Sequence, residues 1–86
     1  MATTGREPET ELRAQFGARI REQRRNLGVS QEELAAIAGI DRTYLSSIER
    51  GQRNVALENI CRIAEALDID PRVLVGGLRT QRRSDR

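Results

Sequence analysis

The sequence contains no histidine and only one cysteine, Cys61, among its 86 residues. A single cysteine cannot form an intramolecular disulfide, and without histidine there is no cluster of imidazole and thiolate ligands for a zinc ion. The absence of histidine also excludes the dyads and triads in which histidine acts as the general base. We therefore expect no metal ion, no cofactor, no catalytic residues and no enzymatic activity.

Long apolar runs and aromatic residues are also scarce. No apolar run approaches the roughly 20 residues that a membrane-spanning helix needs, and the polar, acid-containing segment 1–11 does not resemble a signal peptide. We therefore expect a cytoplasmic protein without a membrane partner. The aromatic residues are Phe16 and Tyr44, too few for a platform that stacks the bases of single-stranded nucleic acid.

Lysine is absent as well, so all 15 basic residues are arginine. The codon bias of a GC-rich genome would produce this composition, but it would not change the chemistry. The planar guanidinium group matches phosphate oxygens and the edge of guanine with two parallel hydrogen bonds. With a net charge of +2 and an isoelectric point of about 9.5, the composition favours duplex DNA as a partner.

Apolar residues recur at helical spacing through the central part of the chain, and there is almost no alternating pattern of strand length. The pattern predicts a domain over residues 11–78 between a flexible tail at 1–10 and a flexible basic tail at 79–86. Phe16, Ile20 and Leu27 are expected to share the buried face of the first helix. The domain is expected to contain five helices, at about 11–26, 31–38, 42–50, 57–67 and 71–75.

Capping residues mark most of the expected helix ends. Ser30 and Glu33 have the spacing of a capping box, and the other expected N-caps are Asp41 and Asp70, which precedes Pro71. For the helix at 57–67 the only strong capping residue nearby is Asn54, so we expect an irregular first turn. Three glycines are expected to end helices in the left-handed conformation: Gly28, Gly39 and Gly51.

The second and third helices have the spacing of a helix-turn-helix, in which two short helices cross steeply. With Gln31 as position one, the small residue required at position five is Ala35, and the turn residue required at position nine is Gly39. The five remaining requirements are apolar residues at positions four, eight, ten, fifteen and eighteen, and these are Leu34, Ala38, Ile40, Leu45 and Ile48.

On these residues, the segment 16–75 resembles the Cro/C1-type (XRE-like) helix-turn-helix family of phage repressors and their bacterial relatives. Within that family, residues 40–54 are similar to the controller proteins of restriction–modification systems. The resemblance implies an all-α, five-helix, lambda-repressor-like domain. It also implies a homodimeric transcription regulator that binds double-stranded DNA at a palindromic operator and is associated with the nucleoid when bound.

The same resemblance bears on partners other than DNA. RNA polymerase is a further candidate partner, whereas a small-molecule effector is not expected because 86 residues leave no second domain to bind it. The alternative function is an antitoxin-type or other small phage-like repressor that also binds a protein partner. The short tails do not favour it, because such a partner is often wrapped by a long tail.

The resemblance also assigns DNA contacts. Arg42 is expected to bind a guanine with two hydrogen bonds, and Thr43 to offer its methyl group to thymine. The expected base contacts are Arg42, Thr43, Ser47 and Tyr44, although Tyr44 could instead pack on the domain. The expected phosphate contacts are Gln31, Ser46, Arg50, Arg53 and Asn54, although Gln31 and Arg53 could instead be solvated.

Two further assignments concern structure. The resemblance pairs Glu49 with Arg24 in a salt bridge that neutralises a carboxylate close to DNA. Cys61 is spaced for a buried apolar position, and a redox role would require an environment that lowers the pKa of its thiol.

The apolar residues at the C-terminal end exceed what one short helix can bury. Leu74 is expected to cover the core, unless all of these residues cap the core of a monomer. The residues expected to form a dimer interface are Ile69, Val73, Val75 and Leu78.

Overall fold

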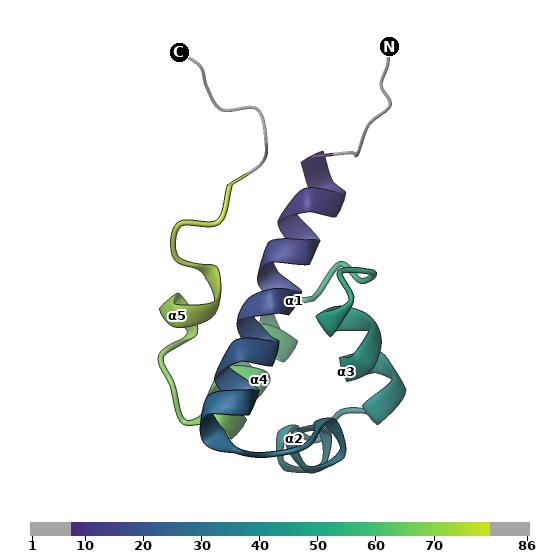
Figure 1. Cartoon of the computed structure of the whole chain (residues 1–86), viewed down its shortest axis with the longest axis vertical. Helices are drawn as coiled ribbons and strands as arrows, with labels where there is room; N and C mark the ends of the chain where they lie inside the picture. Colours follow the sequence, from purple (N-terminus) through teal and green to yellow (C-terminus); the bar gives the residue numbers. More distant parts are fainter. Residues whose placement is uncertain (1–7, 80–86) are drawn as a thin grey trace.

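The computed structural model describes residues 8–79, and these residues form five helices and no strand (Figure 1). None of the described helices has the length and apolarity needed to cross a membrane. The expected all-α, five-helix architecture is confirmed. The helices are α1 (Pro8–Leu27), α2 (Gln31–Ala38), α3 (Arg42–Glu49), α4 (Leu57–Leu67) and α5 (Pro71–Val75).

Most helix ends follow the expected capping residues. The Ser30 hydroxyl accepts a hydrogen bond from the Glu33 amide at 3.0 Å, and the Glu33 carboxylate accepts one from the Ser30 amide at 2.8 Å. The Asp41 carboxylate accepts from the Thr43 amide at 2.7 Å and so caps α3. Gly39 ends α2 with a φ of 73°, in the left-handed region where a side chain is strained.

Two local expectations were wrong. Helix α1 begins at Pro8, so residues 8–10 belong to a helix and not to a tail; proline is well suited to a first helical turn. Leu27, the last residue of α1, is 48% exposed and so does not belong to the buried face on which it was expected. Helix α4 spans the expected residues and ends at Leu67. Its C-cap, Asp68, has a φ of 60°, a left-handed conformation that aspartate tolerates better than most residues. The rest of both predicted tails, except Arg79, lies outside the described residues.

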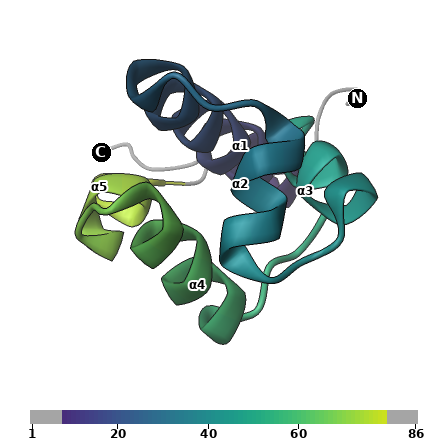
Figure 2. The ribbon, with the colours of Figure 1, turned by 90° about the horizontal axis from the view of Figure 1, so that it is seen from below.

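The core lies between α1 and the helices α3, α4 and α5, and α2 closes it by packing against α3 and α4 (Figure 2). Ile40 and Ile60 are only partly buried and pack against its edge, and Cys61 is half-buried. Burial of apolar side chains stabilises helices as short as α2 and α3, which would not be stable alone. The buried apolar residues are Phe16, Ile20, Leu34, Ala35, Ala38, Leu45, Ile48, Ile63, Ala64, Leu67 and Leu74.

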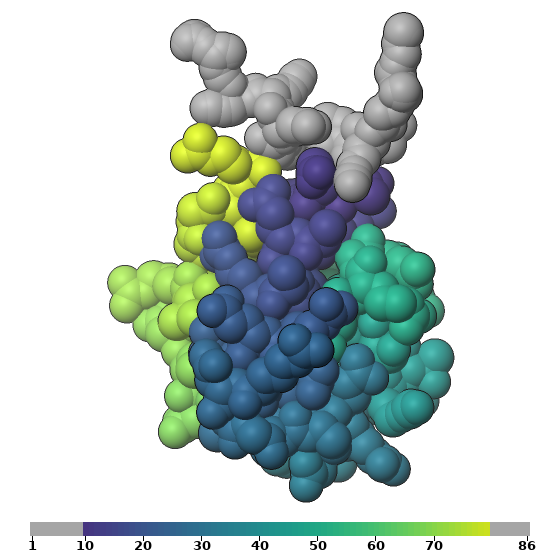
Figure 3. All heavy atoms as spheres, viewed as in Figure 1, coloured from purple at the N-terminus to yellow at the C-terminus, as the bar shows by residue number. Residues whose placement is uncertain are grey.

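Helix α1 separates the recognition helix from the C-terminal segment. Helices α3 and α5 lie on opposite flanks of α1 in both ribbon views, and Figure 3 shows α1 between them on the molecular surface. The Arg19 guanidinium donates hydrogen bonds to the carbonyls of Leu74 and Gly76, and the Gln15 amide donates to the Arg79 carbonyl at 2.9 Å. These contacts fasten the C-terminal segment to the side of α1 that faces away from α3.

Candidate nucleic-acid interface

Helix α3 is amphipathic, and its outward side carries the residues expected to contact DNA. Leu45 and Ile48 are 0% and 1% exposed, which fixes the rotation of the helix about its axis. Arg42 and Thr43 are exposed in its first turn, directly after the Asp41 N-cap. This turn is the part of a recognition helix that enters the major groove most deeply.

The C-cap of α3, Arg50, presents a second basic group. Arg50 is exposed and donates a hydrogen bond to the half-buried Ser46 hydroxyl at 2.6 Å. A longer hydrogen bond of 3.3 Å runs from Arg50 to the Gln52 side chain. Arg50 and Ser46 therefore form one polar unit on the outward side of the helix.

Ser47, an expected base contact, does not lie on this outward side. It is 6% exposed, and its hydroxyl donates to the Tyr44 carbonyl at 2.8 Å while accepting from Arg53 Nε at 3.0 Å. The hydroxyl is thus engaged within the protein. Burial and these two hydrogen bonds disfavour a base contact by Ser47.

Tyr44 and Arg53 form a small cluster that anchors the loop after α3. The Tyr44 hydroxyl accepts a hydrogen bond from the Asn59 amide at 3.2 Å, and Tyr44 packs against the core. The Arg53 guanidinium lies 5.5 Å from the centre of the tyrosine ring, a distance at which a cation and an aromatic face attract. These contacts favour packing as the role of Tyr44. They hold Arg53 in place beside exposed Asn54.

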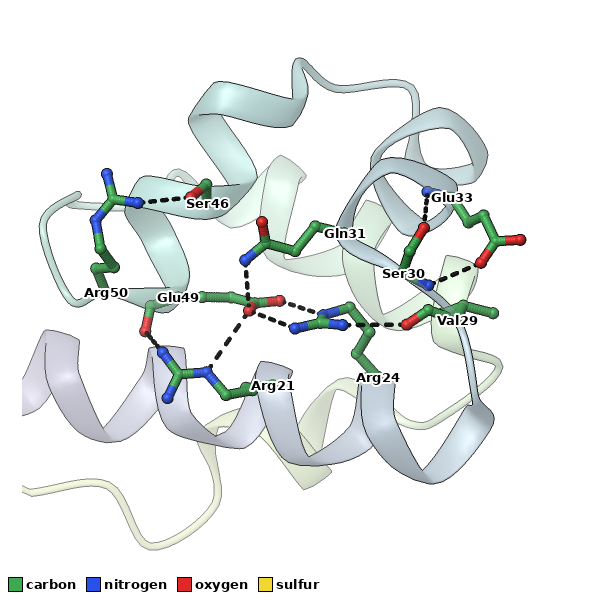
Figure 4. Close-up of polar contacts among 9 residues, drawn as sticks. All are labelled: Arg21, Arg24, Val29, Ser30, Gln31, Glu33, Ser46, Glu49 and Arg50. Carbon is green, nitrogen blue, oxygen red and sulfur yellow. Dashed lines mark hydrogen bonds and ion pairs between the residues drawn. The ribbon is translucent and has the colours of Figure 1, made fainter.

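The Glu49 carboxylate joins three helices. Arg24 of α1 donates to it twice, from Nε to Oε2 at 2.8 Å and from Nη2 to Oε1 at 3.0 Å (Figure 4). Gln31, the first residue of α2, donates from Nε2 to the same Oε1 at 3.0 Å. The side chain of Glu49 is 0% exposed and that of Arg24 is 13% exposed, so this carboxylate is buried with its partners.

Arg21 completes this group, and the sequence analysis missed it. Its Nη2 donates to the Glu49 carbonyl at 3.2 Å, and its Nε lies 3.7 Å from Glu49 Oε1. The available signal was spacing, because Arg21 precedes Arg24 by three residues and so shares its face of α1.

The surrounding groups determine the charge of Glu49. Burial by itself acts to raise the pKa of its carboxyl group. The hydrogen bonds from Arg24 and Gln31, with the charges of Arg24 and Arg21, outweigh burial, so the pKa lies below its usual value. Glu49 therefore stays ionised at neutral pH.

The C-terminal segment leaves apolar surface uncovered. Val73 and Val75 are 42% and 37% exposed, while Leu74 is fully buried as expected. Ile69 and Leu78 are partly buried and pack against the core. A mostly apolar hollow of about 130 Å³ lies beside this segment, and its lining includes Leu12, Phe16, Val55, Ile60, Val75 and Leu78.

Comparison with known proteins gives a consistent result. Residues 20–74 match the model of a family described as helix-turn-helix. The chain is 45% identical to the control protein C.BamHI of Bacillus amyloliquefaciens over 65 residues. This match covers 74% of this chain and 80% of that protein. Among solved structures, the restriction–modification controller protein C.AhdI of Aeromonas hydrophila is 55% identical with a TM-score of 0.71, covering 72% of this chain and 94% of that one. A hypothetical transcription factor from Neisseria is 41% identical with a TM-score of 0.73, covering 87% and 86%.

Proposed function

The chain belongs to the helix-turn-helix family of transcription regulators, and we propose that it is the controller protein of a restriction–modification system that binds a palindromic operator as a homodimer. The observation that carries this proposal is the outward side of α3, where Arg42 and Thr43 are exposed above a buried apolar side. The similarity to C.BamHI and C.AhdI supports the controller role.

In this proposal, the first turn of α3 reads base edges in the major groove. Arg42 donates two hydrogen bonds to a guanine, and Thr43 contacts a neighbouring base. Phosphate contacts fix the register of the protein on DNA without reading sequence. The proposed phosphate contacts are Gln31, Ser46, Arg50, Arg53 and Asn54.

Gln31 can serve both the protein and the DNA. One N–H of its side-chain amide donates to Glu49, which leaves a second N–H for a phosphate oxygen. Gln31 is also the first residue of α2, and the unpaired backbone amides of a helix N-terminus favour anions. A phosphate contact at this position would raise the affinity for every DNA sequence about equally.

A homodimer would cover the apolar surface of the C-terminal segment. Two helix-turn-helix units related by a two-fold axis read half-sites about 34 Å apart, one turn of DNA. The contact surface must lie away from the recognition helix, and the flank of α1 that carries α5 meets this condition. We assign Val73, Val75 and Leu78 to this interface, with Ile69 at its edge.

A gel-shift titration with the DNA upstream of the chain's own gene tests the proposal. Binding should weaken steeply between about 50 and 200 mM salt, because each neutralised phosphate releases a counterion. An affinity that does not change over this range would contradict binding through phosphates.

The gene neighbourhood tests the controller role: adjacent endonuclease and methyltransferase genes would support it, and an adjacent toxin gene would contradict it.

A further inference from the structure

The two arginines that face Glu49 differ in how many of their donors are engaged. Arg24 uses Nε and Nη2 on the Glu49 carboxylate and Nη1 on the Val29 carbonyl at 3.1 Å, and its side chain is 13% exposed. Among the described residues, Arg21 makes one hydrogen bond, to the Glu49 carbonyl, and its side chain is 39% exposed. Arg21 therefore has N–H groups left for a partner outside the protein.

The charges of Glu49, Arg24 and Arg21 also leave Arg21 available to bind an anion. The two short hydrogen bonds from Arg24 neutralise the Glu49 carboxylate, whereas Arg21 Nε lies 3.7 Å from it, beyond hydrogen-bonding distance. Because one carboxylate faces two guanidinium groups, the three side chains carry a net positive charge. Arg21 is the more exposed of the two arginines, so it is the one that a second anion can reach.

Arg21 lies at the edge of the surface proposed to face DNA. It contacts the last turn of α3 through the Glu49 carbonyl, and Figure 4 shows Arg21 and Gln31 approaching the Glu49 carboxylate from opposite sides. Both side chains have a nitrogen within 4 Å of the same oxygen, Glu49 Oε1. The two groups are thus close enough to face the same stretch of a DNA backbone.

We propose that Arg21 binds a phosphate of the DNA backbone, next to the phosphate contact of Gln31, so that α1 contributes directly to DNA binding. The proposal rests on the proposed DNA-binding function. The hydrogen bond to the Glu49 carbonyl holds the guanidinium beside α3 before DNA arrives, which lowers the entropy cost of ordering it. A guanidinium group is well suited to this contact because its donors match two phosphate oxygens.

The salt dependence of DNA binding tests the proposal. In Arg21→Gln, the slope of log affinity against log salt should be shallower by about 0.9, the contribution of one phosphate contact. The affinity should fall by a similar factor for operator and random duplexes, because a phosphate contact carries no sequence information. Arg21→Lys keeps the charge and should keep most of the slope.

Arg62→Gln is the matched control. Arg62 is an exposed arginine on α4, a helix that provides none of the hydrogen bonds to Glu49. Its removal changes the net charge equally and should leave the slope near that of the wild type. Equal slopes for Arg21→Gln and Arg62→Gln would overturn the proposal.

A measurement on the wild type covers the case in which Arg21→Gln does not fold. The Nε–H resonance of Arg21, identified by its absence from the spectrum of Arg21→Lys, should shift when duplex DNA is added, and that of Arg62 should not. An unmoved Arg21 resonance in a chain that binds DNA would reject the contact alone. A wild type that binds no duplex would reject the proposed function and the contact together.

Discussion

At the scale of single residues, Glu49 shows how an acidic group is tolerated on a helix proposed to face phosphates. Its carboxylate is 0% exposed and accepts hydrogen bonds from Arg24 and Gln31. Removing one partner of such a buried pair leaves the other charge uncompensated. We therefore expect Glu49→Ala to lower the free energy of unfolding by about 3–5 kcal/mol, measured by urea denaturation.

A double-mutant cycle shows whether this loss belongs to the pair. Arg24→Ala with Glu49→Ala should cost less than the sum of the two single changes, because the second removal deletes a charge that has already lost its partner. Strictly additive losses would mean that the two residues do not interact in solution.

The lowered pKa of Glu49 makes a separate prediction about pH. The pKa of Glu49 in the folded protein lies below its pKa in the unfolded chain, which is about 4.3. The ionised carboxylate therefore contributes its full stabilisation at any pH above the unfolded-state pKa. This stabilisation is lost as the pH falls through the folded-state pKa. Urea denaturation of the wild type should show stability falling from about pH 5 downward. Glu49→Gln should fall less over the same range, and an equally steep fall would show that Glu49 is not the group responsible.

At the scale of helices, Gly17 permits α1 to cross α3 closely. A Cβ atom at this position would overlap the carbonyl oxygen of Ile48 and lie 2.7 Å from that of Glu49. Alanine is the better helix former by about 1 kcal/mol, but the overlap with backbone costs about 1–3 kcal/mol and cannot be relieved by a side-chain rotation. Gly17→Ala should therefore lower the melting temperature.

The neighbouring residue provides the control for that substitution. Ala18 is exposed on the same helix, so Ala18→Gly measures what alanine contributes to α1 without an interhelical contact. A Gly17→Ala variant that melts above the wild type would contradict the close crossing.

The helices themselves could be predicted from the sequence because their signals are local. Ser30, Asp41 and Gly39 act within a few residues of their position, so their effect can be recognised without the fold. The burial of Ser47 could not be predicted, because it depends on Arg53 returning across the loop to bond its hydroxyl. The role of Arg21 depends likewise on which part of α3 lies against α1.

At the scale of the whole molecule, the C-terminal segment is the surface that a second subunit would cover. Val75 is 37% exposed and lies beside the apolar hollow, so an aspartate there would place a charge in the proposed interface. Val75→Asp should remain folded but sediment as a monomer at micromolar concentration, and it should bind the operator more weakly than the wild type. A wild type that is monomeric both free and on DNA would contradict the dimer.

The central claim is that the outward side of α3 reads a DNA sequence as part of a two-fold symmetric assembly. Selection from a pool of random duplexes tests it most directly. The wild type should enrich a palindrome with half-sites about one helical turn apart, and Arg42→Ala should enrich the same site with one base pair relaxed in each half. A pool that shows no common motif after repeated selection by a folded wild type would contradict the claim.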